Sequence, residues 1–302
     1  MSDTPARGEQ KVFIDEHVRI LVEEEAGRRI DERVSAESSL IDDTEGLSRV
    51  PKERWQEAQR YEQRTWMDQG RDLQTDRNDY HRERFGEYAA LHGKRFSRAI
   101  ELGCGPFTNM RLIMRECAVG EIVLLDPLIE QYLAHPYCQY RTLHLGGAKR
   151  LLGDTVKRKG TNRGLRHVLN VMASEGLRGR RVKIIPSMIE ECPPVGCFDL
   201  VVMINVIEHC QDAEAVFRKI MDLSRPGTML VFGDILYDPL SFREQMRRLY
   251  DVGHPLRVAP QYVEGLLAKH FSEVYCRKEP IVREFCGVPA DHQEIYFIGI
   301  RR

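Results

Sequence analysis

Short apolar runs alternate with segments of helical spacing over the last two thirds of the chain. The runs that we expect to form strands are 95–101, 121–125, 182–186, 197–205, 228–234, 273–278 and 293–302. Segments with helical periodicity separate several of these runs, at 108–117, from 212 onward and at 259–270. Strands that alternate with helices form a parallel sheet covered on both faces. The pattern therefore predicts a doubly wound α/β domain over 91–302.

The first ninety residues have a different pattern. Two segments with helical spacing and many charged side chains, 11–33 and 51–88, lie on either side of a polar segment, 35–50, which we expect to be a loop or linker. We therefore predict that residues 1–90 form a helical N-terminal extension or lid.

Two tryptophans in this extension admit two interpretations. Trp55 and Trp66 lie eleven residues apart, which places them on one face of a helix. That face packs against the core or a second copy of the chain, as in a homodimer, or it covers a pocket. In the second case Tyr80 and His81 face the same pocket. The sequence leaves both interpretations open.

A basic insertion interrupts the α/β pattern at 135–181. It is longer than a crossover helix requires and carries many lysines and arginines. One interpretation is that the insertion binds a phosphate-bearing acceptor, such as a nucleotide sugar, a lipid-linked glycan or RNA. The alternative is a solvated helical insertion. We favour the alternative, because no aromatic side chains for stacking lie between Arg150 and Arg181.

Composition narrows the class of protein. The 302 residues are 42% hydrophobic and carry a net charge of -1, so no overall field attracts nucleic acid or an anionic membrane. We expect no membrane span and no signal peptide. The eight cysteines are scattered without a C-x-x-C pair, which is typical of free thiols in the cytoplasm. Cys192 and Cys197 lack further ligands nearby, and we predict no metal site.

The segment 99–110, AIELGCGPFTNM, predicts a strand, a tight turn and a helix. Gly103 and Gly105 let the backbone approach a ligand closely, with loop amides directed at it. Glu101 is a carboxylate at the end of a buried strand, and we expect a cationic or hydrogen-bond-donating ligand as its partner. The third glycine of a dinucleotide site is missing. Asp126 ends the next strand, where a carboxylate can hold a ribose diol.

Three motifs together resemble those of class I S-adenosylmethionine-dependent methyltransferases. They are E-L-G-C-G-P at 101–106, I-V-L-L-D at 122–126 and F-D-L-V-V with V-I-E-H at 198–209. The resemblance covers about 95–302, without the basic insertion. It implies a seven-stranded Rossmann-like sheet whose last strand is antiparallel, with the helical N-terminal extension and the helical insertion added to it.

The resemblance also implies the cofactor, S-adenosyl-L-methionine, and its product, S-adenosyl-L-homocysteine. Its implied binding residues are Glu101, Gly103, Cys104, Gly105, Asp126, Pro127, Ser187, Met188, Asn205 and Val206. Glu101 would steer the loop and the cationic amino acid moiety, and Asp126 would accept both ribose hydroxyls. Met188 would contact the adenine, beside Ser187 where the family commonly has an aspartate.

Methyl transfer to an alcohol benefits from a general base with a pKa near neutrality, which suits histidine. The catalytic candidates are His254 in G-H-P-L, His209 after the fourth strand, and His292. No N-P-P-Y or D-P-P-Y run is present, which argues against methylation of a nucleobase amine. We therefore predict O-methylation of a small molecule or a sugar or glycan acceptor. The alternatives are an N-methyltransferase, an RNA methyltransferase, and a non-catalytic protein that binds the cofactor.

Overall fold

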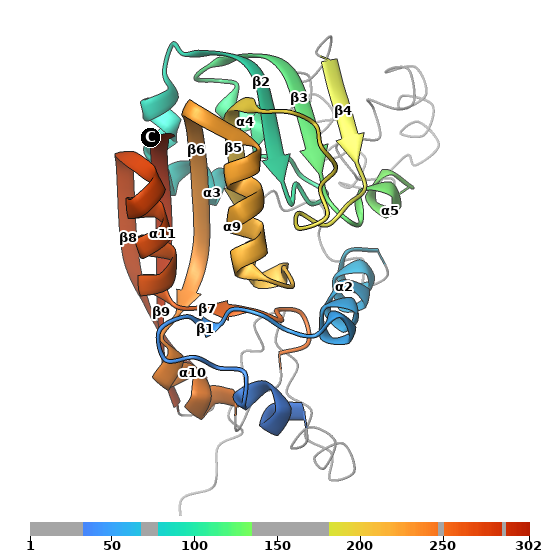
Figure 1. Cartoon of the computed structure of the whole chain (residues 1–302), viewed down its shortest axis with the longest axis vertical. Helices are drawn as coiled ribbons and strands as arrows, with labels where there is room; N and C mark the ends of the chain where they lie inside the picture. The colour runs from blue at the N-terminus through green and yellow to red at the C-terminus, as the bar shows by residue number, and fades with distance from the viewer. Residues whose placement is uncertain (1–32, 68–77, 135–180, 247–250, 286–287) are drawn as a thin grey trace, which may run out of the picture.

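The computed structural model describes residues 33–67, 78–134, 181–246, 251–285 and 288–302 (Figure 1). The predicted helix at 11–33 and the basic insertion at 135–181 lie outside these residues, apart from the last residue of each. Among the described residues, no helix is long and apolar enough to cross a membrane.

One mixed sheet of seven strands forms the centre of the molecule, in the order β4-β3-β2-β5-β6-β9-β8. The strands are β2 Arg95–Leu102, β3 Ala118–Leu125, β4 Arg181–Ile185, β5 Phe198–Ile204, β6 Ser224–Tyr237, β8 Phe271–Phe285 and β9 Val288–Arg301. Strands β4 to β6 pair in parallel, and β9 is antiparallel to both of its neighbours. The predicted doubly wound sheet with an antiparallel last strand is confirmed.

Helices cover both faces of this sheet (Figure 1). They are α2 Lys52–Met67, α3 Asn78–Arg84, α4 Met110–Ile113, α5 Ile129–Ala134, α9 Ala213–Asp222, α10 Pro239–Met246 and α11 Pro260–His270. Two further helical elements are 3-10 turns, Gly86–Leu91 and Ile207–His209. A two-stranded sheet joins β1 Gly46–Leu47 to β7 Arg257–Val258.

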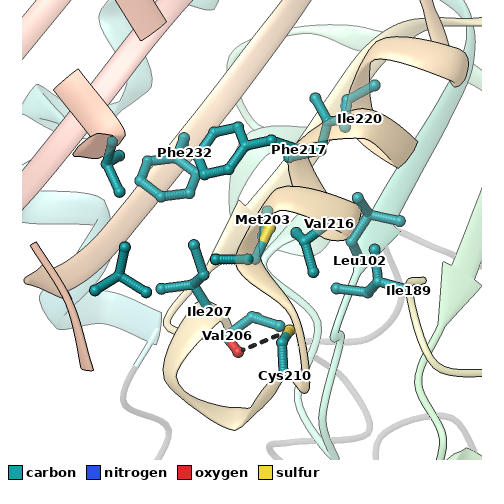
Figure 2. Close-up of a cluster of buried hydrophobic side chains, with 14 of the residues drawn as sticks. Leu102, Ile189, Met203, Val206, Ile207, Cys210, Val216, Phe217, Ile220 and Phe232 are labelled. Atoms are coloured by element: carbon teal, nitrogen blue, oxygen red, sulfur yellow. Dashed lines mark hydrogen bonds between the residues drawn. The ribbon is translucent and has the colours of Figure 1, made fainter. Parts of the chain in front are cut away.

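The core has one hydrophobic cluster on each face, because successive side chains of a strand point to opposite sides. In β5, Val201 and Met203 belong to one cluster and Leu200 and Val202 to the other. Figure 2 shows part of the first cluster, where side chains of α9 pack against the sheet. Both faces of the central strands are therefore apolar, which explains their nearly continuous hydrophobic runs.

Three predicted boundaries are wrong. The helix expected at 108–117 covers only α4, because the chain must return quickly to the start of β3, where Ala118 N–H donates to the Lys94 carbonyl. The segment 224–227, which lies before the predicted strand 228–234, is the irregular start of β6. The segment 279–292, which lies between the predicted strands 273–278 and 293–302, extends β8 and β9 as a hairpin, since β8 is an edge strand and an edge tolerates proline.

The segment 35–50, expected to be loop or linker, contains β1, whose backbone pairs with β7 far along the chain. This pairing joins the N-terminal part of the described chain to the segment before α11. The division into domains 1–90 and 91–302 stays a prediction. What the fold does establish is that α2 lies beside the ends of the central strands, where it forms part of a cavity wall.

Candidate active site

A cavity of about 720 Å³ lies where the central parallel strands end. Gly103, Asp126 and Asn205, which directly follow β2, β3 and β5, line it. Helix α2 adds a second wall, and the segment 251–257 adds a third. The volume is within the range of small-molecule sites, roughly 300–1,000 Å³. Trp55, Trp66, Tyr80 and His81 line the cavity, as the pocket interpretation of the extension predicts, and both tryptophans also pack against the core, as the other interpretation predicts.

The turn after β2 is shaped by two glycines with positive φ, 66° at Gly103 and 53° at Gly105. A Cβ on Gly103 would lie 2.3 Å from Val206 Cγ1, so this glycine lets the loop after β5 pack closely. A Cβ on Gly105 would meet no atom within 4 Å, and Gly105 lines the cavity together with Cys104. The turn therefore leaves open space at Gly105 for a ligand to approach the backbone.

Glu101 has a different partner from the one expected. Its fully buried carboxylate accepts hydrogen bonds from Thr108 Oγ1, from Asn109 N–H at 2.8 Å and from Asn109 Nδ2 at 3.1 Å. Glu101 is not among the described residues that line the cavity. We therefore correct the expected direct contact with a cationic ligand: Glu101 positions the end of the glycine turn.

Burial raises the pKa of Glu101 to about 7, against hydrogen bonds from Thr108 and Asn109 that favour the charged form. Because the folded-state pKa lies above the ordinary value of 4.5, the contribution of Glu101 to stability is present at acid pH and is lost as the pH rises through about 7. We expect the free energy of unfolding without ligand to fall more between pH 5 and 8 in the wild type than in Glu101→Gln. Urea titrations at the two pH values measure this difference. Parallel losses in both proteins would contradict it.

Asp126 lines the cavity and holds two backbone segments at once. Its Oδ2 accepts the Gly105 N–H at 2.9 Å, and its Oδ1 accepts the Leu128 N–H at 2.8 Å. Burial raises the pKa of Asp126 to about 6. Each carboxylate oxygen retains acceptor capacity after one hydrogen bond. Asp126 can therefore fix the glycine turn and still accept hydroxyl groups from the cavity.

The loop after β5 is fixed by the carboxylate of Asp234. One oxygen, Asp234 Oδ2, accepts the N–H groups of Val206 at 2.9 Å and Ile207 at 2.8 Å. Asn205 has a positive φ of 58°, so the chain turns sharply there and exposes Asn205 and Val206 to the cavity.

The segment after β4 contributes only part of what we expected. Met188 lines the cavity, and so does Pro127 from the segment after β3. Ser187 does not line it, and its hydroxyl instead donates to the Met188 carbonyl at 3.0 Å. The expected contact of Ser187 with the cofactor is therefore corrected, because the side chain is used within its own turn.

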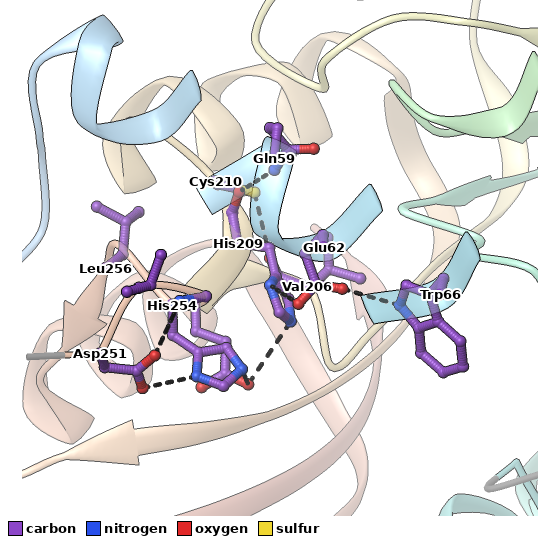
Figure 3. Close-up of polar contacts among 12 residues, drawn as sticks. Gln59, Glu62, Trp66, Val206, His209, Cys210, Asp251, His254 and Leu256 are labelled. Atoms are coloured by element: carbon purple, nitrogen blue, oxygen red, sulfur yellow. Dashed lines mark hydrogen bonds and ion pairs between the residues drawn. The ribbon is translucent and has the colours of Figure 1, made fainter. Parts of the chain in front are cut away.

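A second part of the cavity holds a cluster of two carboxylates and two imidazoles, Glu62, Glu208, His209 and His254, which we name the acceptor cluster. Figure 3 shows three of these residues, Glu62, His209 and His254. His209 Nδ1 lies 3.7 Å from Glu62 Oε1, and His209 Nε2 lies 3.8 Å from Glu208 Oε1. His254 Nε2 lies 3.6 Å from Glu208 Oε1. The imidazole centroids are 4.7 Å apart. Residues from three separate segments thus converge.

The outer atoms of the acceptor cluster are fixed by neighbouring side chains. Trp66 Nε1 donates to Glu62 Oε2 at 2.8 Å, and the Tyr237 hydroxyl donates to Glu208 Oε2 at 2.8 Å. The Asp251 carboxylate contacts His254 Nδ1 at 2.8 Å. Helix α2 also supplies Trp55 and Gln59, which donate to the His209 carbonyl at 3.1 and 3.2 Å. These contacts leave the inner atoms of the cluster directed at one another.

The charge of His254 follows from its neighbours. Burial alone would lower its pKa, but the carboxylates of Asp251 and Glu208 outweigh burial and raise the pKa of His254 to about 9. An imidazole with this pKa carries a proton at neutral pH and cannot accept another. We therefore correct the prediction that His254 is the leading general base.

The family comparison agrees with this architecture. A family model described as a methyltransferase domain matches residues 73–269, which is more than half of the 302 residues. The chain belongs to this methyltransferase family. It is an S-adenosylmethionine-dependent methyltransferase of class I, as the sequence motifs predict.

The solved structures to which this chain is similar are distant in sequence. N-methyltransferase NodS from Bradyrhizobium japonicum, in complex with S-adenosyl-L-homocysteine, is 16% identical with a TM-score of 0.45, covering 82% of this chain and 98% of that chain. The YcgJ protein from Bacillus subtilis is 13% identical with a TM-score of 0.47, covering 74% and 99%. A 1,6-didemethyltoxoflavin-N1-methyltransferase from Burkholderia thailandensis is 12% identical with a TM-score of 0.42, covering 83% and 91%. No curated protein matches the sequence.

The cofactor of the methyltransferase is S-adenosylmethionine, and the residues present fit this group. The space beside Gly105 admits a ligand against the backbone. Asp126 has remaining acceptor capacity for a diol, and Met188 offers an apolar contact on the same cavity. These features lie at the carboxyl ends of adjacent strands, which is where ligands bind in doubly wound sheets.

His292, the third predicted catalytic histidine, also lines the cavity. It is buried and packs edge-on against Tyr237, with ring centroids 4.3 Å apart. The two residues are direct partners in the pairing of β6 with β9. His209 and His254 are thus brought together, whereas His292 packs against Tyr237, and its catalytic role stays a prediction.

Sequence reasoning missed the carboxylates of the acceptor cluster and the residues that fix them. Glu208 lies within the V-I-E-H motif, and its position next to His209 was an available signal. Asp251 precedes His254 by three residues and could have been found as a partner of that histidine. Glu62 had no such signal, because it reaches the cluster only through the packing of α2 against the loop after β5.

Proposed function

We propose that the methyltransferase transfers the methyl group of S-adenosylmethionine to a hydroxyl oxygen of a neutral small molecule, such as a sugar or glycan unit. The observation that carries this proposal is the acceptor cluster, which lies in the same cavity as the glycine turn. A hydroxyl acceptor must lose a proton as its oxygen is methylated, so acid–base groups near the acceptor accelerate the reaction.

The proposed donor half of the cavity contains the turn and the loops around it. Asp126 would accept the ribose hydroxyls while it holds the Gly105 amide. Met188 would pack on the adenine, and Asn205 and Val206 would border the nucleoside. When bound, S-adenosylmethionine supplies a methyl group that its sulfonium already activates. The protein then has to align donor and acceptor and to receive the acceptor's proton.

The proposed acceptor half presents groups that accept hydrogen bonds. Within the described part of the chain, Glu62 Oε1 and His209 Nδ1 are buried atoms without a hydrogen-bond partner. An acceptor hydroxyl that reaches these two atoms would satisfy them and be polarised for attack. Glu208, held by Tyr237 and facing both imidazoles, keeps the local charge negative.

The charges of the cavity favour a neutral acceptor over an anionic one. Carboxylates on the described part of its wall include Glu37, Glu62, Glu190, Glu208, Asp251 and Glu294. The described wall has one arginine, Arg257, which is paired with Asp251, and no lysine. A phosphate would be repelled here, so a phosphate-bearing acceptor or RNA has less support. The aromatic rings of Trp55, Trp66 and Phe107 suit a sugar or an aromatic ring instead.

An amine acceptor is the second candidate. The same carboxylates would attract an ammonium group, and an amine also has to lose a proton to the acceptor cluster before it is methylated. A homodimer and a cytoplasmic location stay predictions from the sequence.

A panel assay with labelled S-adenosylmethionine tests the proposed function. The panel contains neutral sugars and phenols, primary and secondary amines, their phosphorylated counterparts and RNA. We expect label transfer to neutral hydroxyl compounds, and we expect phosphorylation of an accepted compound to reduce it. Transfer confined to amines would move the function to the second candidate, and transfer confined to RNA or phosphorylated compounds would overturn the proposed acceptor class.

A further inference from the structure

Three residues of the acceptor cluster have the composition and spacing of a metal site. One ligand atom each from Glu62, His209 and His254 lies within 4.8 Å of the other two. A divalent ion holds nitrogen and oxygen ligands at roughly 2.0–2.2 Å, which separates ligands on opposite sides of the ion by about 4 Å. Small side-chain movements would therefore close this cluster on an ion.

Two atoms of the cluster point independently to a ligand. Glu62 is 7% exposed, and its Oε1 has no hydrogen-bond partner in the described part of the protein. His209 Nδ1, 3.7 Å from that oxygen, is also buried and lacks such a partner there. Buried polar atoms without partners are costly, so they indicate a missing group between or beside them. A cation would satisfy the carboxylate oxygen and the imidazole nitrogen together.

The surrounding contacts match the support that metal ligands require. Ligating imidazoles commonly hold a carboxylate at their other nitrogen, and His254 holds Asp251 at Nδ1 and presents Nε2 to the cluster. Glu62 is fixed in the same manner by Trp66 at Oε2, which leaves Oε1 for an ion. These second contacts orient the inner atoms without occupying them.

The negative charges near the acceptor cluster favour a divalent cation. Metal binding requires neutral imidazoles, so the cation displaces the proton that His254 carries in its absence, and the charge of Asp251 is matched by Arg257. Glu62 and Glu208 then leave two negative charges in a buried site. Two imidazoles with carboxylates suit Mn²⁺, Co²⁺ or Zn²⁺ better than Mg²⁺ or Ca²⁺, which prefer oxygen ligands alone.

We propose that Glu62, His209 and His254 bind a first-row divalent cation, with Glu208 beside it, and that this cation activates the acceptor hydroxyl. The binding site itself stands on the geometry of the cluster, and its chemical role rests on the proposed function. The cation lowers the pKa of the acceptor hydroxyl, whose proton passes to the acceptor cluster at Glu208. The hydroxyl oxygen then forms the bond to the methyl carbon as the carbon–sulfur bond breaks, and the sulfur keeps the electron pair of that bond.

Metal titration of the metal-stripped full chain tests this site. We expect about one equivalent of Mn²⁺ or Zn²⁺ to bind, measured by calorimetry and, for Mn²⁺, by electron paramagnetic resonance. Glu62→Gln and His209→Asn should each weaken binding at least about tenfold. Trp66→Phe, which keeps a ring but removes the donor to Glu62, should weaken it by a smaller factor. His92→Ala, which removes an exposed imidazole paired with Glu116, is the matched control and should bind metal as the wild type does.

S-adenosylmethionine affinity is measured on the same samples and separates this proposal from the proposed function. Retained cofactor binding with no stoichiometric metal, or with equal metal binding in wild type and both ligand variants, overturns the metal site alone. Metal binding without any S-adenosylmethionine binding leaves the site intact and contradicts the proposed function. Melting temperatures show whether each variant is folded, and two independent ligand variants keep the test decisive if one of them unfolds.

Discussion

Asp126→Ala is expected to weaken binding of S-adenosylmethionine by at least about 100-fold. The carboxylate would lose hydrogen bonds to the ribose hydroxyls, and hydrogen bonds to a charged group contribute roughly 1.5–3 kcal/mol each. The variant also releases the Gly105 and Leu128 amides, so the turn that borders the donor loses its anchor. Calorimetry with S-adenosylmethionine and with S-adenosylhomocysteine measures both affinities.

Asp199 offers a matched control for Asp126. It is also a carboxylate that accepts two backbone amides, those of Ser97 and Arg98, at 2.9 and 3.1 Å. Asp199 is not among the described residues that line the cavity. Asp199→Ala should therefore lower the melting temperature without changing cofactor affinity. An unchanged affinity in folded Asp126→Ala, or an equal loss in both variants, would contradict the assignment of the ribose site to Asp126.

The sheet and the turns at its carboxyl edge could be predicted because their signals are local. Apolar runs of strand length specify β2, β3 and β5, and the residues directly after each run must meet at one edge. Gly103, Asp126 and Asn205 line one cavity for this reason. The place of Asp126 in the cavity could be predicted from its position at the end of a buried strand alone.

The acceptor cluster could not be predicted in the same way because it forms through long-range packing. Glu62 is brought to His209 by hydrogen bonds from α2 to the carbonyl of His209. The spacing of residues in α2 does not predict this contact between Glu62 and His209. The charge of His254 depends on Asp251 and Glu208 together, and only one of these is near it in sequence. The sequence therefore predicted a neutral imidazole as the general base, whereas the carboxylates around His254 in the structure keep it protonated.

The partner of Glu101 illustrates a different limit. The sequence showed that a buried carboxylate requires a donor, but the donor could be a ligand or the chain itself. Thr108 and Asn109 supply it from the far end of the same turn. Both possibilities obey the same rule for buried charges, so only the three-dimensional structure distinguishes them. The choice matters, because it makes Glu101 a positioning residue rather than a contact of the cofactor.

Glu208→Gln is expected to reduce methyl transfer by about 10³-fold, within the range for removal of an acid–base group. The substitution keeps the size of the side chain and an oxygen for the Tyr237 hydroxyl, but it removes the charge that faces His209 and His254. We expect little change in S-adenosylmethionine affinity, because Glu208 has no described contact with the glycine turn or Asp126. Turnover is measured with the acceptor that the panel identifies, and affinity is measured by calorimetry.

Glu294→Gln is the matched control for Glu208→Gln, because both glutamates are buried, line the cavity and accept a tyrosine hydroxyl. The Tyr80 hydroxyl lies 2.8 Å from one oxygen of Glu294, as the Tyr237 hydroxyl lies from Glu208. Glu294 is outside the acceptor cluster, so Glu294→Gln should change the KM for the acceptor more than kcat. Equal losses of kcat in the two variants would show that any carboxylate of the cavity serves. The specific role of Glu208 would then be wrong, since the effect would come from the general negative field rather than from its contact with the two imidazoles.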